Sequence, residues 1–235
     1  MNILPTIEVP TYTTKIPSTG QTINYRPYLV KEEKILLIAL ESEDYNQVID
    51  AINDIVITCL DNKFKLDDLT VFDIEYLFIK IRAKAVGETT KIGYRCETEG
   101  CEEITEVNVN FDDVVVSGLD DIKKQYDLGN GLIIDMALPK ASGVHSLTDV
   151  EPDDIVITSV ANLIETIYHN EEIYDATKIP LPEVIEFLGN LNTTQFNPLL
   201  DSVLTIPHIE YDVKWKCKCG TDNEINYSSL SDFFT

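Results

Sequence analysis

The spacing of hydrophobic positions changes several times along the chain, and each change predicts a different kind of element. Polar and apolar residues alternate on either side of the turn-forming "PSTG" at residues 17–20, which predicts an N-terminal β-hairpin. Between residues 30 and 88 apolar residues recur every three or four positions, which predicts three helices. The alternating pattern then returns up to about residue 138.

The second and third predicted helices have clear local signals. In the second, one apolar stripe includes Cys59, which we interpret as a core residue because a free buried cysteine behaves as a small hydrophobe. The third is expected to begin at Thr70, to form a capping box with Asp73 and to end at Gly87. Its middle is apolar nearly all round, so we expect it to be the central buried helix.

Two short stretches beyond residue 88 predict hairpins with cysteines at their tips. "ETTKIGYRC" and "EEITEVNVNF" alternate on either side of the first tip, and "IEYDVKWKC" and "NEINYSS" flank the second. We expect the two hairpins to pair into one small sheet. The intervening residues 140–204 are expected to be helical, with a helix start at Pro182 and another at Asn192. One predicted helical stripe comprises Val156, Val160, Leu163, Ile164 and Ile167.

These elements predict an α+β protein. An N-terminal β-hairpin and helices would occupy residues 1–88. A zinc-ribbon-like β part, formed by residues 89–138 and 205–235, would enclose a helical insertion at residues 139–204.

The net charge of the chain disfavours negatively charged partners. There are 41 acidic and 18 basic residues, a formal net charge of −23, which repels nucleic acid and anionic membranes. Such a charge favours basic protein partners, or it simply solubilises the surface. No stretch approaches the roughly 18 apolar residues of a membrane span. The start does not resemble a secretory signal, so we expect the cytoplasm in which the chain was made.

Four of the five cysteines lie in the two hairpin tips. Cys96 and Cys101 belong to the first, and Cys217 and Cys219 belong to the second. Two facing knuckles would supply the four thiolates of one tetrahedral zinc ion. The spacings depart from the usual two intervening residues, since the first pair has four and the second has one. Free thiols, or disulfide and redox chemistry, remain open alternatives.

A zinc ion with four cysteine ligands has no open position for a substrate, so we expect a structural role. None of the three histidines, His145, His169 and His208, lies in a metal or nucleophile motif. The sequence also has no phosphate-binding glycine loop and no hydrolase or metalloprotease motif. We therefore expect neither an enzyme nor a small-molecule substrate.

Three features of the sequence resemble a known family. They are "YRPYLVKEEKILLIALES" at residues 25–42, "FDIEYLFIKIRAKAVGE" at residues 72–88 and the two cysteine knuckles. Together they resemble the baseplate hub subunit family of T-even-like contractile-tailed bacteriophages. The resemblance implies a non-enzymatic virion protein of the tail baseplate, assembled in the host cytoplasm by binding other tail and baseplate proteins. A transient assembly chaperone absent from the mature virion is the alternative, and a zinc-ribbon adaptor protein is a more distant one.

Five aromatic or arginine residues are candidate partner-binding positions, because such residues are enriched at the anchors of interfaces. They are Tyr25, Arg26 and Tyr28 near the N-terminal hairpin and Phe233 and Phe234 near the C-terminus. The alternative is that they pack on the chain's own core.

Overall fold

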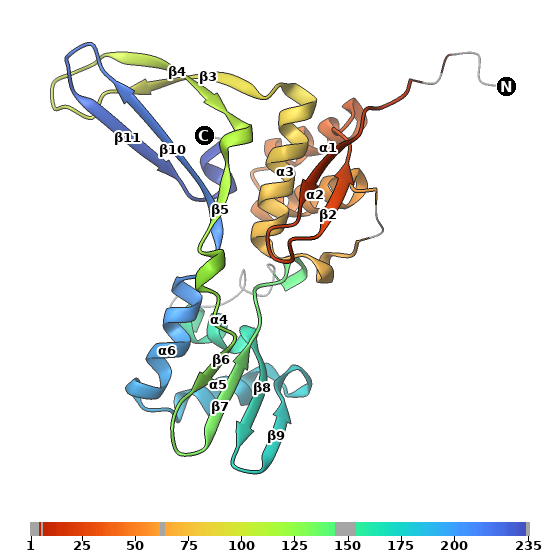
Figure 1. Ribbon diagram of the computed structural model, residues 1–235, viewed down its shortest axis with the longest axis vertical. Coiled ribbons are helices and arrows are strands. Elements are labelled where there is room, and N and C mark those ends of the chain that lie inside the picture. Colours follow the sequence, from red (N-terminus) through yellow and green to blue (C-terminus); the bar gives the residue numbers. More distant parts are fainter. Residues whose placement is uncertain (1–4, 6, 62–63, 144–153, 234–235) are drawn as a thin grey trace. The chain divides into compact units, whose positions relative to one another are not determined.

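The computed structural model describes all residues except 1–4, 6, 62–63, 144–153 and 234–235. The chain divides into two compact units (Figure 1). Unit 1 comprises residues 1–117 and 208–235, and unit 2 comprises residues 118–207. Both contain helices and antiparallel strands, which confirms the α+β fold class.

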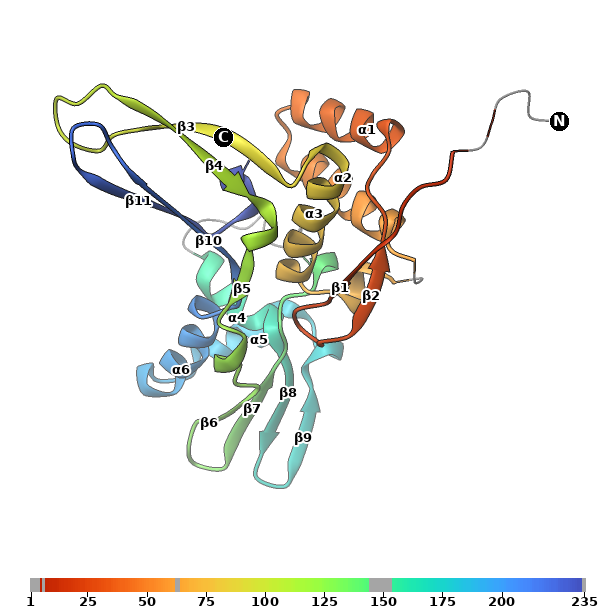
Figure 2. The same cartoon turned by 45° about the horizontal axis from the view of Figure 1, so that its top comes forward.

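Unit 1 begins with the predicted hairpin. Strand β1 (Tyr12–Lys15) pairs antiparallel with β2 (Thr22–Tyr25). Three helices follow: α1 (Val30–Glu41), α2 (Tyr45–Cys59) and α3 (Val71–Val86). Helix α1 packs on α2, and α2 packs on α3 (Figure 2). The other side of α3 contacts β-strands of the same unit, so α3 is the central helix of unit 1.

The ends of α3 follow from its sequence. The Thr70 hydroxyl accepts a hydrogen bond from the Asp73 backbone N–H, and the Asp73 carboxylate accepts one from the Thr70 N–H, which confirms the capping box. The same carboxylate accepts two hydrogen bonds from Ser18 in the hairpin turn, at 2.9 and 2.6 Å. The helix ends at Gly87, whose φ of 119° suits a residue without a side chain. Asp73 therefore joins the N-terminal hairpin to the central helix.

Two further hairpins complete unit 1. Strands β3 (Thr89–Arg95) and β4 (Ile104–Asn110) form one, and β10 (His208–Lys216) and β11 (Asp222–Tyr227) form the other. Strand β5 (Val115–Ser117) pairs with the start of β10. The expectation of a single small sheet is wrong, because β3-β4 and β11-β10-β5 are separate sheets.

Aromatic side chains explain why the two hairpins do not share a sheet. The rings of Tyr94 and Trp215 lie 5.0 Å apart, and the hydroxyl groups of Tyr94 and Tyr227 form a buried hydrogen bond of 2.7 Å. These large rings stack the hairpins face to face and favour burial over edge-to-edge pairing. The strands of the two hairpins therefore do not pair with one another, although β10 also pairs with β5.

Unit 2 is a four-stranded antiparallel sheet covered by helices. The sheet order is β6-β7-β8-β9. Its strands are β6 (Gln125–Asp127), β7 (Leu132–Met136), β8 (Ile164–His169) and β9 (Glu172–Asp175). Its helices are α4 (Ile155–Leu163), α5 (Leu181–Gly189) and α6 (Thr193–Leu204). The predicted helix starts at Pro182 and Asn192 are confirmed.

One face of this sheet forms the core of unit 2. Leu132, Ile134 and Met136 alternate along β7 and pack with Val160 of α4 and Leu188 of α5. The described chain also has short 3₁₀ helices, among them Leu66–Asp68, Phe111–Asp113, Leu119–Asp121, Ala176–Lys178 and Leu230–Phe233.

The predicted helical stripe is wrong beyond Leu163. Ile164 and Ile167 belong to β8, which pairs with β7 on one side and β9 on the other. The segment "IETIYH" is rich in β-branched and aromatic residues, and pairing on both sides satisfies its backbone. The division into two units differs from the three parts expected from the sequence. Residues 118–138 lie in unit 2, together with the segment that was expected to be a helical insertion.

Candidate metal centre

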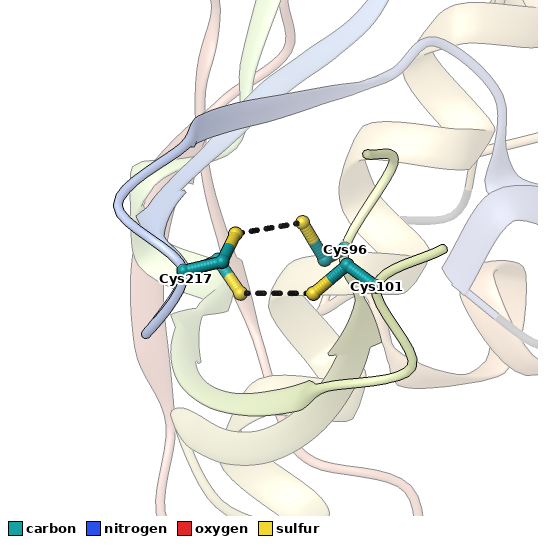
Figure 3. Close-up of side chains that lie close together, drawn as sticks. Cys96, Cys101 and Cys217 are labelled. Atoms are coloured by element: carbon teal, nitrogen blue, oxygen red, sulfur yellow. Dashed lines mark hydrogen bonds between the residues drawn. The ribbon is translucent and has the colours of Figure 1, made fainter. Parts of the chain in front are cut away.

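The four cysteines of the hairpin tips come together in space. Cys96 directly follows β3, and Cys101 lies three residues before β4. Cys217 directly follows β10, and Cys219 lies in the turn that leads to β11. Figure 3 shows the Cys96 and Cys101 side chains pointing from one hairpin toward the tip that carries Cys217.

The sulfur atoms form a compact group. The Sγ atoms of Cys96 and Cys219 lie 3.7 Å apart, and those of Cys101 and Cys217 lie 3.8 Å apart. All four lie within 4.8 Å of one another. Because each close pair takes one cysteine from each hairpin, the sulfur atoms mark the point at which the two tips meet.

Each tip is a tight turn that directs two sulfur atoms to one side. In the first tip the Cys96 N–H donates to the Glu103 carbonyl, and the Cys101 N–H donates to Thr98. In the second tip the Cys217 N–H donates to the Thr221 carbonyl at 2.9 Å. The turn requires a positive φ at Gly220, 98°, which a glycine adopts readily because it has no side chain. These backbone hydrogen bonds therefore hold the positions of the thiols without the help of a ligand.

The distances fit a tetrahedral ion. Zn–S bonds of about 2.3 Å place tetrahedral sulfur ligands about 3.8 Å apart. Two sulfur–sulfur distances between the tips, 3.7 and 3.8 Å, match this edge length. A disulfide would require about 2.05 Å, and all five cysteines are free thiols. The four sulfur atoms therefore have the number and spacing that hold a metal ion.

Two threonines support the sulfur atoms from outside the group. Oγ1 of Thr98 lies 3.4 Å from the Cys96 sulfur, and Oγ1 of Thr221 lies 3.4 Å from the Cys219 sulfur. As thiols, Cys96 and Cys219 donate to these hydroxyls, and the Thr98 hydroxyl donates its own proton to the Thr221 hydroxyl at 2.9 Å, from one tip to the other. When Thr98 donates to Thr221, the Thr221 proton is available to the Cys219 sulfur. Outer hydrogen bonds of this kind orient and tune metal ligands.

The environment separates the acidities of the thiols. Hydrogen bonds from Thr221, through its side chain and its backbone, lower the pKa of Cys219 to about 6. The pKa of Cys96 is also lowered, chiefly by the Thr98 side chain. For Cys217 a backbone hydrogen bond from Cys219 lowers the pKa, but burial and the neighbouring sulfur atoms outweigh it and raise the pKa to about 12. The two thiols beside threonines are therefore the first to become thiolates, the form that binds metal.

Comparison with known proteins identifies the family of the chain. Residues 9–235 match the model of a family described as T4 bacteriophage base plate protein. The chain belongs to this baseplate protein family. Neither the curated proteins nor the solved structures with which the sequence was compared contain a match.

Membership makes this chain a component of the phage tail baseplate. The family is structural, its location is the baseplate of the virion tail, and its members contact other phage tail proteins. Among the helices of the described residues, none is long and apolar enough to cross a membrane.

The residues predicted to bind partners are buried or half-buried where the structure describes them. Tyr25 and Tyr28 are 3% and 8% exposed, and the half-buried Arg26 pairs with Glu32 at 3.0 Å. Phe233 packs against aromatic rings of its own unit, with Tyr227 at 5.0 Å between centroids. Tyr25 and Tyr28 thus belong to the core of unit 1, Arg26 and Phe233 are half-buried, and Phe234 lies outside the described residues.

The remaining candidates have ordinary structural positions. Cys59 is buried in α2, as predicted, and burial raises its pKa to about 11. His208 begins β10, and His169 ends β8. His145 lies outside the described residues.

Sequence reasoning missed Thr98 and Thr221, although a signal was present. Each threonine follows a cysteine by two positions, in Cys96-Glu97-Thr98 and in Cys219-Gly220-Thr221. This repeated spacing in both tips could have indicated their shared role beside sulfur.

Proposed function

We propose that this baseplate protein is a non-enzymatic component of the baseplate hub, which binds sibling tail proteins and uses one structural zinc ion to join its two hairpin tips. The observation that carries the proposal is the family match over nearly the whole chain, together with four cysteine sulfur atoms within 4.8 Å. The hub assignment draws its support from the resemblance of residues 25–42 and 72–88 to hub subunits.

The ligand set favours zinc and a structural role. Thiolates are soft ligands, and a tetrahedral group of four is typical of zinc or of iron–sulfur centres. With Cys96, Cys101, Cys217 and Cys219 all bound, a single ion would have no open position for a substrate. The ion would instead stabilise the junction of β3-β4 with β10-β11. These four cysteines are thus proposed as ligands, with zinc as the resident ion.

A transient assembly chaperone is the second candidate function. Like a hub component, a chaperone would need a stable fold and contacts with tail proteins, so the present geometry suits both. The net charge of −23 disfavours the third candidate, a zinc-ribbon adaptor on nucleic acid, because phosphates would be repelled.

Quantitative mass spectrometry of purified virions tests the proposal. A hub component should be present at a fixed ratio to other baseplate proteins. If the protein is required for tail assembly but missing from virions, the chaperone is correct and the hub component is refuted. Complementation of a phage that lacks the gene tests whether the cysteine group is needed for assembly, by comparison of two variants of the same turn. Cys219→Ser should impair tail assembly, whereas Lys218→Ser, which alters the same exposed turn without removing a sulfur, should not.

A further inference from the structure

The outer surface of α1 is unusually apolar for a solvent-facing helix. Val30 is 80% exposed, and Ile35, Leu37 and Ile38 are 54%, 53% and 56% exposed. By contrast, α2 and α3 each have one large apolar residue that is well exposed in the described chain, Tyr45 and Val86 respectively. At about 100° per residue, Val30, Leu37 and Ile38 lie on the side of α1 opposite the buried Leu36, with Ile35 and Leu40 at the two edges of that side. We call this side, which also carries Lys34 and Glu41, the outer face.

This exposure does not result from a loosely attached helix. The opposite side of α1 buries Leu36 and Ala39 against unit 1. Glu32, which is 6% exposed, accepts hydrogen bonds from the Arg26 guanidinium and from the Leu29 backbone N–H, so the first turn is fixed. A helix that is apolar on both sides is typical of a position between two packed layers. In the described chain one of these layers is present, and the outer face lacks the other.

The charges around the outer face indicate what would cover it. The last turn of α1 has no basic residue, although its carbonyl end carries a partial negative charge. Glu41, Glu43 and Asp44 add three carboxylates at this end. Lys31 and Lys34 lie in the first half of the helix. A partner should therefore present basic side chains to the C-terminal end of α1.

A second copy of the chain fits these charges poorly. Each copy has a net charge of −23, so a symmetric contact would bring two strongly acidic surfaces together. A helix from another protein fits better. A partner helix with apolar residues at three- and four-residue spacing could pack its apolar stripe along α1. Anionic membrane is disfavoured by the same charge.

We infer that the outer face of α1 is the docking site for a basic amphipathic helix of another tail protein. This inference rests on the proposed function, in that the chain acts by binding sibling tail proteins. It adds the surface and the chemistry of the partner. The anchors of the contact would then be residues of the outer face, in place of the buried Tyr25 and Tyr28.

Binding of a synthetic helix to the full-length protein tests the surface. The probe is an 18-residue peptide with leucine at helical spacing and lysine elsewhere, compared with a scrambled peptide of the same composition. The amphipathic peptide should bind at least about tenfold more tightly than the scrambled one. The double variant Leu37→Ser/Ile38→Ser should lose this preference. Ile173→Ser, which alters a still more exposed isoleucine of β9 in unit 2, should keep it.

Three results would overturn the inference. Equal binding of both peptides would show that charge alone attracts the probe, and an unchanged preference in the double variant would show that the peptide docks elsewhere. A wild-type dimer in light scattering that becomes a monomer in the double variant would show that a second copy covers the outer face. Because both substituted side chains are exposed, the melting temperature of the variants should match the wild type.

Photo-crosslinking in infected cells identifies the natural occupant. A benzophenone amino acid at position 37 should crosslink to a basic amphipathic helix of another tail protein. A crosslink to the same chain or to lipid, or no crosslink in assembled tails that contain the protein, would refute the inference while leaving the hub proposal intact. Conversely, the expected crosslink in cells combined with absence from virions would support the docking site and refute the hub component.

Discussion

Replacing Cys219 by serine should weaken metal binding and destabilise unit 1. Cys219 contributes one of the four sulfur atoms, and its side chain is at an exposed position, so the substitution itself creates no cavity. Its sulfur lies 3.7 Å from that of Cys96 in the opposite hairpin. A serine hydroxyl is a poor replacement because the metal prefers a thiolate.

The size of the effect can be worked from the ligand number. Structural zinc sites in small peptides bind with about 10–16 kcal/mol, or about 3 kcal/mol for each of four ligands. Losing one ligand should therefore weaken zinc binding by about 100-fold. Since bound zinc stabilises the folded state, the free energy of unfolding in zinc should decrease by the same amount. For a unit of this size, about 3 kcal/mol corresponds to a decrease in melting temperature of about 10 °C.

Thermal unfolding with excess zinc and with a chelator measures this effect. The only tryptophan of the chain, Trp215, stacks on Tyr94 between the two hairpins, so its fluorescence reports their separation. The wild-type protein and Cys219→Ser should differ by about 10 °C in zinc and should coincide in chelator. Lys218→Ser is the matched control. It removes an exposed ion pair with Glu103, which is worth less than about 1 kcal/mol, so it should behave like the wild type.

The reasoning would be refuted by a protein purified without metal that keeps its melting temperature in chelator. An equal decrease for Cys219→Ser in zinc and in chelator would also refute it. In that case the sulfur would act through packing within the tip, and the four cysteines would be incidental free thiols.

Three further predictions follow from neighbouring features. Thr98→Val and Thr221→Val should each weaken zinc binding by about tenfold in competition with a chromophoric chelator, but should leave the melting temperature in chelator unchanged; unaltered affinity would show that the hydroxyls do not act on the sulfur atoms. Burial raises the pKa of Glu75 from 4.5 to about 7, against the opposing effects of the Leu230 N–H and His208. The folded state then keeps a proton that the unfolded chain releases, so stability falls as the pH rises through this range. Glu75→Gln should be more stable than the wild type by about 3 kcal/mol at pH 8 and equal to it near pH 4.5 in urea unfolding, and a constant difference would exclude titration of Glu75. Finally, replacing residues 118–207 by a short glycine–serine linker should leave unit 1 folded with its zinc affinity unchanged, as measured by metal analysis and tryptophan fluorescence.

Local features of this fold could be predicted from the sequence, because the decisive residues are close together in it. The capping box of Thr70 and Asp73 and the two cysteine tips depend on neighbours within a few positions. Ile164 and Ile167 were misassigned because a spacing of three residues fits a helical stripe, while the pairing partners that make β8 a strand lie in β7 and β9.

The contacts between distant segments could not be predicted in the same way. The stacking of Tyr94 on Trp215 separates the two hairpins into two sheets, and nothing near either residue indicates the other. The meeting of Thr98 with Thr221 has the same origin. The four cysteines were found because metal coordination requires a fixed number of ligands, which links distant pairs even without knowledge of packing.

The topology of unit 1 explains how two cysteine pairs so far apart in sequence can form one group. Ser117 at the end of β5 pairs with His208 at the start of β10, so the chain leaves unit 1 and returns to it at neighbouring points. The entropic cost of closing the intervening segment rises only slowly with its length, and the pairing of β5 with β10 already opposes that cost. A metal ion held by the four cysteines would therefore not have to close the long segment. It would act at the other end of β10, beyond Lys216, where it would join two hairpin tips whose strands belong to separate sheets. Closure at one end of β10 and metal binding at the other are thus separable, which is why removal of unit 2 should spare the zinc site.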